Sequence, residues 1–207
     1  SHKITADYDV TVVDNASYDE TIKMVENDFP QVRLIKNVSN LGYAKAINRG
    51  IAAVSSDYFL ILNPDIIVLP GSIDQMLKFM EQYKGVGISG CKLLNADGTI
   101  QLSARRFFDL RTILYRFTLL RGILSGSALE KYHLMQDWDH RDNREVDWLL
   151  GSALMVRDAA LQQVGGMDEN IFLYFEDVDW CYRMWKKNWR VAYIAQAEMV
   201  HQHIRAS

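Results

Sequence analysis

The stretch Tyr58-Phe59-Leu60-Ile61-Leu62-Asn63-Pro64-Asp65 carries the pattern from which the fold can be predicted. Its apolar residues are rich in aromatic and branched side chains, which predicts a short buried strand that ends in a polar turn. Runs of the same character occur at Val10 to Val13, Val32 to Ile35 and Val86 to Ser89. The four runs therefore predict four strands of one sheet.

Apolar residues at helical spacing lie between these strands. They form three faces: Ile22, Val25 and Phe29; Ile47, Ile51 and Val54; Ile73, Met76, Leu77 and Met80. Because strands alternate with helices, the sequence predicts an α/β fold with a mostly parallel central sheet and helices on both sides. Ligands of such sheets bind outside the carboxyl ends of the strands.

Polar residues follow three of the predicted strands, in the segments 14–17, 37–42 and 63–65. Asp, Asn and Ser also favour turns and helix caps for local reasons, so any single segment has a simple explanation. Three such clusters at the same end of one sheet favour a ligand site.

The second half of the chain departs from simple alternation. Residues 147–156 predict a turn that leads into a buried strand, and Arg190 to Ile194 predict a final strand that leads to His201. Between them, the carboxylates of the run Glu176-Asp177-Val178-Asp179 fall in the first turn of a predicted helix. The helix dipole stabilises carboxylates there, but their number exceeds what a cap needs.

Composition limits the classes of function. The chain has 207 residues, of which 49% are hydrophobic and 24% charged, as in globular proteins. Its formal net charge of −3 predicts no nucleic-acid partner. The distant cysteines Cys91 and Cys181, and the absence of a long apolar run or a signal peptide, predict a soluble cytoplasmic protein in a reducing compartment.

Short motifs recur along the chain in a definite order: Val13-Asp14-Asn15-Ala16-Ser17, Asn40-Leu41-Gly42 with Ala46 and Asn48-Arg49-Gly50, Leu62-Asn63-Pro64-Asp65, Gly151-Ser152-Ala153, Gly165-Gly166-Met167-Asp168-Glu169, Glu176-Asp177-Val178-Asp179 and His201. This order resembles the family 2 inverting glycosyltransferases, and within them a bacterial rhamnosyltransferase-like branch. The resemblance implies a single GT-A domain over residues 1–207. A nucleotide-binding half would span about 9–100, and a catalytic, acceptor-binding half with a smaller mixed sheet about 101–207.

The resemblance also implies roles in holding the donor, a dTDP- or UDP-linked sugar. Asp14 would accept a hydrogen bond from the N–H of the pyrimidine base. Asn40, Gly42 and Asn48 would lie along the nucleotide, where the missing side chain of Gly42 permits close approach of the backbone.

A divalent cation, Mg²⁺ or Mn²⁺, is implied at the donor diphosphate. Asp65 matches the last acid of the family's Asp-x-Asp motif, and a hard cation prefers such oxygen ligands. Asn63 stands where many relatives have the first Asp, so this donor-side position has one negative charge fewer. His201 matches a histidine that completes the metal site in some relatives.

The resemblance places catalysis on the helix that begins near Glu176. Asp177 matches the general base, which takes the proton of an acceptor hydroxyl in a single inverting displacement, and Glu176 would orient the site. Trp148 and Gly151 would bind the acceptor, with the tryptophan as a platform for a sugar ring; a core position is the alternative for Trp148. Asp179 would cap the helix.

Residues of about 107–124 predict a basic amphipathic helix. Six apolar positions fall on about one third of its circumference: Leu110, Ile113, Leu114, Phe117, Leu120 and Leu124. Arg111 and Arg116 flank this arc and Arg121 falls inside it. Three partners remain open for this face: the core of the same domain, a second subunit, or an anionic membrane at its cytoplasmic side that carries a lipid-linked acceptor.

The expected activity is the transfer of a sugar, rhamnose in the branch resembled, to a saccharide or lipid-linked saccharide in bacterial surface polysaccharide synthesis. A catalytically silent sugar-nucleotide-binding or interaction domain is one alternative. A nucleotidyltransferase is a weaker one, because the first strand is not followed by a glycine- and lysine-rich loop. Relatives open with one more strand and helix before the Asp14 motif, so we expect that unit to be absent here.

Overall fold

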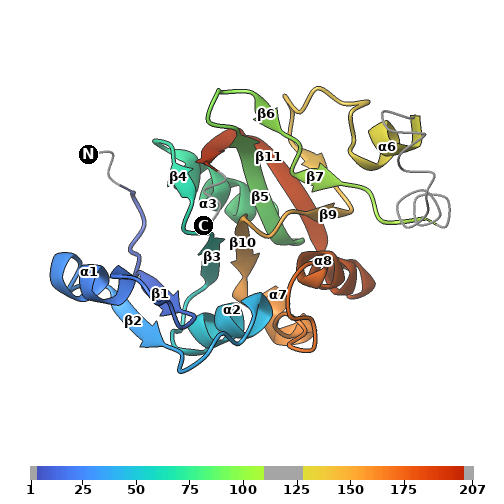
Figure 1. The fold of residues 1–207 in the computed structure, drawn as a ribbon. Coiled ribbons are helices and arrows are strands. Elements are labelled where there is room, and N and C mark those ends of the chain that lie inside the picture. Colours follow the sequence, from blue (N-terminus) through green and yellow to red (C-terminus); the bar gives the residue numbers. More distant parts are fainter. Residues whose placement is uncertain (1–3, 110–127, 203–207) are drawn as a thin grey trace.

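The protein is described by a computed structural model over residues 4–109 and 128–202. A seven-stranded sheet lies at the centre, with helices on both faces (Figure 1). Its path runs through β3 (Tyr58–Leu62), β10 (Ala153–Arg157), β5 (Val86–Leu94), β11 (Arg190–His201) and β4 (Ile66–Val68). The short strands β6 (Ile100–Gln101) and β8 (Arg144–Glu145) pair with β5 and β11. The predicted α/β class with helices on both sides of a sheet is confirmed.

The pairing within this sheet is mixed, where we expected it to be mostly parallel. β5 and β11 are parallel, but β10 is antiparallel to both β3 and β5, and β4 is antiparallel to β11. The strands β3, β5 and β11 therefore run in one direction, as alternation with helices requires. The difference arises because β10 comes from the second half of the chain and enters between two strands of the first half.

Two smaller sheets flank the central one. β1 (Thr11–Asp14) and β2 (Arg33–Lys36) form a parallel pair, joined by α1 (Thr21–Asp28). β7 (Ala104–Arg105) and β9 (Trp148–Leu149) form an antiparallel pair close to the region predicted to bind the acceptor. All four strands predicted in the first half are present, but β1 and β2 stand apart from the central sheet.

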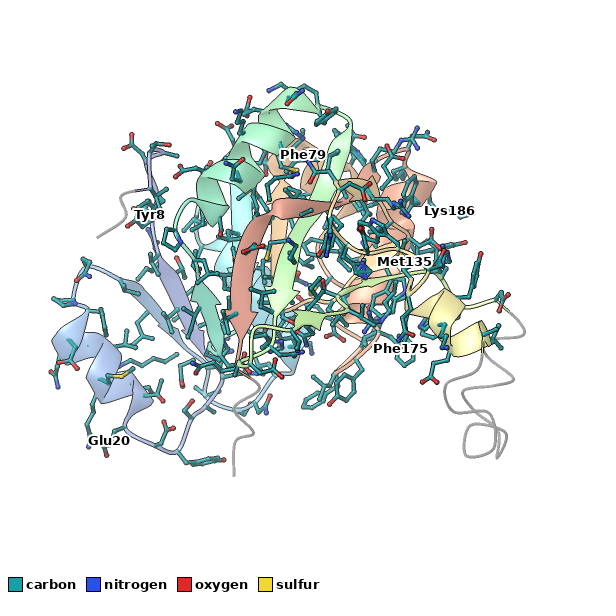
Figure 2. The ribbon with its side chains drawn as sticks, turned by 90° about the horizontal axis from the view of Figure 1, so that it is seen from above. Tyr8, Glu20, Phe79, Met135, Phe175 and Lys186 are labelled. Atoms are coloured by element: carbon teal, nitrogen blue, oxygen red, sulfur yellow. The ribbon has the colours of Figure 1, made fainter. Side chains whose placement is uncertain are left out.

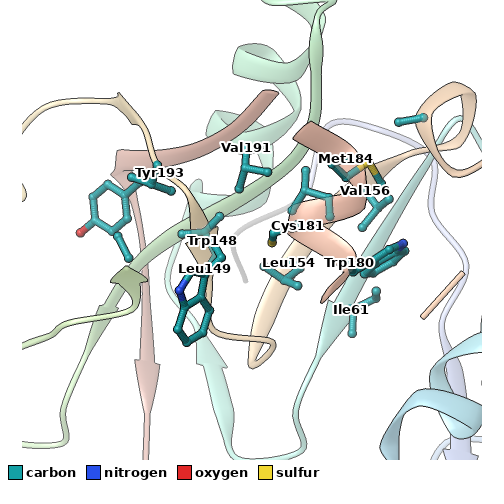
Figure 3. Packing of buried hydrophobic residues seen from close by; sticks show 14 of the residues in the cluster. Ile61, Trp148, Leu149, Leu154, Val156, Trp180, Cys181, Met184, Val191 and Tyr193 are labelled. Carbon is teal, nitrogen blue, oxygen red and sulfur yellow. The ribbon is translucent and has the colours of Figure 1, made fainter. Parts of the chain in front are cut away.

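Helices pack on the central sheet because its buried strands alternate between two cores. Leu154 and Val156 of β10 point into a core with α7 (Asp158–Val164) and α8 (Glu176–Lys186), where Trp180 and Met184 are fully buried (Figure 3). Ala153 and Met155 of the same strand join the core under α3 (Ser72–Gln82). The helix α2 (Tyr43–Ala52) packs on the α8 side, and α6 (Ala128–His133) is a short outlying helix (Figure 1).

The predicted amphipathic segment lies largely outside the described residues. Only its start is seen: Phe107 and Phe108 pack against the core on the α8 side, and the backbone N–H of Phe107 donates to Asp147 Oδ2 at 2.7 Å. Among the described residues, no helix has the length and apolarity required to cross a membrane.

Candidate active site

Asp14 ends β1 and is 3% exposed. Its Oδ2 accepts the backbone N–H groups of Ala16 and Ser17 at 3.1 and 3.2 Å, so one oxygen shapes the following turn. Its buried Oδ1 has no partner in the described part of the chain. A buried acceptor of this kind is costly unless a donor reaches it, and the N–H of a pyrimidine base is such a donor.

The amides that follow β1 and β2 form one network. Asn40 Oδ1 accepts Asn15 Nδ2 at 2.8 Å and the backbone N–H of Gly42 at 2.9 Å. Asn15 Oδ1 accepts Asn37 Nδ2 at 3.0 Å, and Asn37 is buried. The structure thus places Asn40 where it shapes the loop before α2, and its contact with a nucleotide stays a prediction.

The open side of Gly42 is filled by the chain itself. Gly42 has φ of +86°, and a Cβ there would lie 2.7 Å from the carbonyl oxygen of Phe172. The same carbonyl accepts the backbone N–H of Tyr43 at 3.1 Å. Residue 172, which precedes the acidic helix α8, thus packs closely against Gly42, and the expected approach of the nucleotide to Gly42 stays a prediction.

Asn48 also binds the segment before α8. Its Nδ2 donates to the carbonyl of Met167 at 2.8 Å and to Glu169 at 3.1 Å, while its Oδ1 accepts the N–H of Met167 at 2.9 Å. A Cβ at Gly166 would clash with Asn48 Oδ1. Both ends of this amide are thus occupied by the protein, and its predicted place along the nucleotide stays untested.

Asn63, Asp65 and His201 come together at one end of the central sheet. Asp65 Oδ2 lies 3.3 Å from His201 Nε2, and His201 pairs with Ile66 in the register of β11 with β4. His201 Nδ1 lies 3.0 Å from Gln101 Oε1. The two residues that the resemblance implies as metal ligands therefore lie beside each other, and their role as ligands stays a prediction.

The donor set of this cluster suits a divalent cation. Asn63 Oδ1 and Asp65 Oδ1 are buried and have no hydrogen-bond partner among the described residues. If His201 donates its Nδ1 proton to Gln101, its Nε2 lone pair faces the Asp65 carboxylate, and a cation between the two would satisfy both. The described residues contain no cluster of three or more His, Cys, Asp or Glu side chains around one point, so an amide oxygen and the donor diphosphate would have to supply the remaining ligands.

Asp177 lies in the first turn of α8. Its Oδ1 accepts the N–H of Val178 at 2.8 Å, and its Oδ2 accepts the N–H of Gly151 at 3.0 Å. Phe175, which precedes the helix with φ of +69°, makes no side-chain cap. Asp177 therefore satisfies one N–H at the start of α8, as a capping residue would, and the helix dipole favours its negative charge there.

Burial sets the electrostatics of both acidic residues. It raises the pKa of Asp177 above the usual range for an aspartate, while the N–H groups of Gly151 and Val178 lower it. Burial likewise raises the pKa of Glu176, and the neighbouring charge of Asp177 adds to that rise. Glu176 Oε2 is buried without a partner among the described residues. A raised pKa makes a carboxylate a stronger base once it is ionised.

The turn at Gly151 and Ser152 connects α8 to the cluster of Asn63, Asp65 and His201. The carbonyl of Ser152 accepts the backbone N–H of Asn63 at 2.9 Å, while the N–H of Gly151 donates to Asp177. The Tyr43 hydroxyl donates to the carbonyl of Gly151 at 2.8 Å. Tyr43 was missed in the sequence, where nothing but its place after Gly42 distinguishes it.

Trp148 is 5% exposed, and its Nε1 donates to the carbonyl of Arg106 at 3.0 Å. It therefore occupies the core position that was the alternative, and its faces are not open to a sugar ring. Exposed aromatic side chains occur instead in the segment just before Asp177 in the chain, at Phe172, Tyr174 and Phe175. Figure 2 shows Phe175 on the side of the molecule opposite to Phe79 of α3.

Asp179 forms an ion pair and not the expected cap. Its Oδ2 accepts Arg183 Nε at 2.7 Å, one turn along α8. The two terminal nitrogens of Arg183 then donate to the carbonyls of Val164 and Gly166 at 3.0 and 2.8 Å. Asp179 thus holds the arginine that ties α8 to the loop after α7.

Comparison with solved structures identifies the class of this fold. The GalNAc-T7 structure with UDP, GalNAc and Mn²⁺ superposes with a TM-score of 0.68 at 12% identity, over 94% of this chain and 38% of that one. The mannosyltransferase from Pyrobaculum calidifontis with GDP-Man and Mn²⁺ gives 0.61 at 15% identity, over 96% and 49%. The fold is that of the GT-A glycosyltransferases.

Sequence comparison then specifies the family. The sequence model of glycosyl transferase family 2 matches residues 3–129, and the chain belongs to this family. It is 33% identical to the N-acetylglucosaminyl-diphospho-decaprenol L-rhamnosyltransferase of Mycobacterium tuberculosis, over 93% of this chain and 66% of that protein. It is 30% identical to a rhamnosyltransferase of Escherichia coli, over 70% and 52%. The matched region thus spans from about half to just under two thirds of these relatives.

Proposed function

We propose that this chain is the catalytic unit of an inverting glycosyltransferase with Asp177 as the general base. The observation that carries the proposal is the junction at Gly151 and Ser152. The N–H of Gly151 donates to the carboxylate of Asp177, and the carbonyl of Ser152 accepts the backbone N–H of Asn63. Asn63 precedes Asp65 by two positions in the chain. In this proposal, the base for the acceptor, Asp177, and the cluster of Asn63, Asp65 and His201 that would bind the donor are connected through one turn.

The geometry of Asp177 leaves it able to take a proton. Each oxygen already accepts one backbone N–H, but a carboxylate offers about four lone-pair positions. A free lone pair would accept the proton of an acceptor hydroxyl while that oxygen forms a bond to the anomeric carbon. The bond from this carbon to the diphosphate breaks on the opposite face, and its electron pair leaves with the nucleoside diphosphate. One base is sufficient for this displacement.

The donor would be held by the first half of the chain. Asp14 would bind the base of a dTDP- or UDP-linked sugar through its unpartnered oxygen. Asp65 and His201, with Asn63, would hold Mg²⁺ or Mn²⁺, which offsets the charge on the departing diphosphate when bound. Rhamnose is the proposed sugar because two relatives bear rhamnosyltransferase names.

A saccharide or lipid-linked saccharide is the proposed acceptor, in bacterial surface polysaccharide synthesis at the cytoplasmic face of the membrane. The decaprenol-linked acceptor in the name of the mycobacterial relative supports a lipid-linked substrate. The proposal of membrane contact rests on residues 107–124. Flotation with liposomes that contain anionic lipid tests it, since binding to neutral and anionic liposomes alike would contradict an electrostatic contact.

The base is tested by Asp177→Asn, which keeps the size of the side chain but cannot accept the proton. We expect transfer to fall by at least about 10²-fold, as loss of a general base typically does, while donor affinity in calorimetric titration is retained. Asp28→Asn is the matched control, because Asp28 is exposed at the end of α1. Full activity of the Asp177 variant would refute the assignment.

The donor half is tested by calorimetric titration with a panel of nucleotides, with and without Mn²⁺. We expect dTDP or UDP to bind more tightly with the metal, and Asp65→Ala to remove that dependence. Binding without transfer by the unaltered protein would support a silent binding domain instead, and preference for a nucleoside triphosphate would support a nucleotidyltransferase.

A further inference from the structure

Tyr43 lies between the two halves of the site although no motif includes it. It is the first residue of α2, directly after the loop that carries Asn40 and Gly42. Its ring contacts the core on the α8 side, and its hydroxyl donates to the carbonyl of Gly151 at 2.8 Å. A helix of the nucleotide half thus reaches the turn that binds Asp177.

The two hydrogen bonds at Gly151 fix both of its peptide groups. Its N–H donates to Asp177 Oδ2 at 3.0 Å, and its carbonyl accepts the hydroxyl of Tyr43. A Cβ built at Gly151 would lie 3.6 Å from both Tyr43 Cε1 and Asp177 Cβ, so both side chains border this turn. If the Tyr43 bond is lost, the turn can rotate about Gly151 and move the N–H away from the carboxylate.

We propose that Tyr43 is a positioning residue for Asp177, acting through the Gly151 turn. This inference rests on the proposed function, because it assumes that Asp177 is the base. The phenol is suited to the role as a neutral donor: burial, together with the charges of Glu176 and Asp177, raises its pKa well above the usual value for tyrosine. The Gly151 N–H in turn favours the ionised form of Asp177.

A positioning role differs from a purely structural one in its kinetic signature. Loosening of the Gly151 N–H removes a hydrogen bond from the ionised carboxylate, which raises the pKa of Asp177. The acid limb of the pH dependence of kcat should then move to higher pH. Loss of general stability would instead lower donor affinity and kcat together without moving that limb.

The test is Tyr43→Phe, which keeps the buried ring and removes only the hydroxyl. We expect kcat to fall about three- to tenfold, the size of effect of one lost hydrogen bond. The KM for donor should stay unchanged, and the acid limb of kcat should shift upward. Tyr83→Phe makes the same chemical change at a half-exposed ring next to Phe79, on the far side of the sheet, and should leave both quantities unchanged.

The variants Asp177→Asn and Tyr43→Phe test the base role of Asp177 and the positioning role of Tyr43 separately. If Asp177→Asn is inactive while Tyr43→Phe has the kcat and acid limb of the unaltered protein, the positioning role is refuted and the base is not. If Asp177→Asn remains active, the base assignment itself is refuted. A fall in kcat with weaker donor binding and an unmoved acid limb would show that Tyr43 is structural only. All variants are assayed at a temperature at which circular dichroism shows them folded.

Discussion

Asn48→Ala should destabilise the protein more than the loss of an amide side chain on a helix surface usually does. The substitution removes the partners of both the N–H and the carbonyl of Met167, which is 3% exposed. An unsatisfied buried backbone group costs about 1–3 kcal/mol, so two groups predict a loss of about 2–6 kcal/mol in the free energy of unfolding. At about 2–4 °C per kcal/mol for a chain of this size, the melting temperature should fall by roughly 4–24 °C.

Urea unfolding and thermal melts measure this effect, and Asn170→Ala is the matched control. Asn170 lies in the same segment but is exposed, and its amide reaches only the carboxylate of Asp168. We expect its loss to stay below about 1 kcal/mol. If the free energies of unfolding of Asn48→Ala and Asn170→Ala differ by less than about 0.5 kcal/mol, the reasoning from buried partners is wrong. Donor titration of the folded variant tests the other role of Asn48: a loss of affinity at unchanged stability would support its contact with the nucleotide.

Two further predictions concern the helix that carries Asp177. On the acid side, kcat should rise with pH as Asp177 loses its proton. Because burial raises the pKa of Asp177, the midpoint of this rise should lie above the value of about 4 for an ordinary aspartate. A pH–rate profile of kcat with a lower midpoint would contradict the burial argument. Gly42→Ala should cost more stability than Gly98→Ala in parallel melts, since both glycines have positive φ but only the Cβ at 42 would meet Phe172, 2.7 Å away. Equal losses would show that the contact with residue 172 is unimportant.

Local sequence pattern was sufficient to predict several parts of the molecule. The strand at Tyr58–Leu62 was predicted at its observed bounds, because a short apolar run between polar residues has few other conformations. The acidic start of α8 was found because its carboxylates exceed what a helix cap requires. Asp65 and His201 were paired by family resemblance, since the chain separation between them gives no local signal.

Long-range packing decided what the sequence could not predict. The insertion of β10 between β3 and β5 depends on tertiary pairing, which periodicity does not encode. The bonds from Tyr43 to Gly151 and from Asn48 to Met167 cross 108 and 119 residues of chain. Trp148 illustrates the same limit, because a tryptophan before a turn has the same local sequence whether its ring is exposed or buried.

The contacts of α2 with the second half of the chain connect this helix to the turn that binds Asp177. The helix holds the second half at the backbone of Phe172, at Gly151 and at Met167, through Tyr43 and Asn48. No side-chain cap precedes α8, so the carboxylate of Asp177 is held by the backbone N–H groups of Val178, in the same helix, and of Gly151, outside it. Any movement of α2 would therefore reach Asp177 through the two hydrogen bonds at Gly151. Because this path uses the backbone of Gly151, changes in the exposed side chains of Phe172 and Tyr174 should leave it intact.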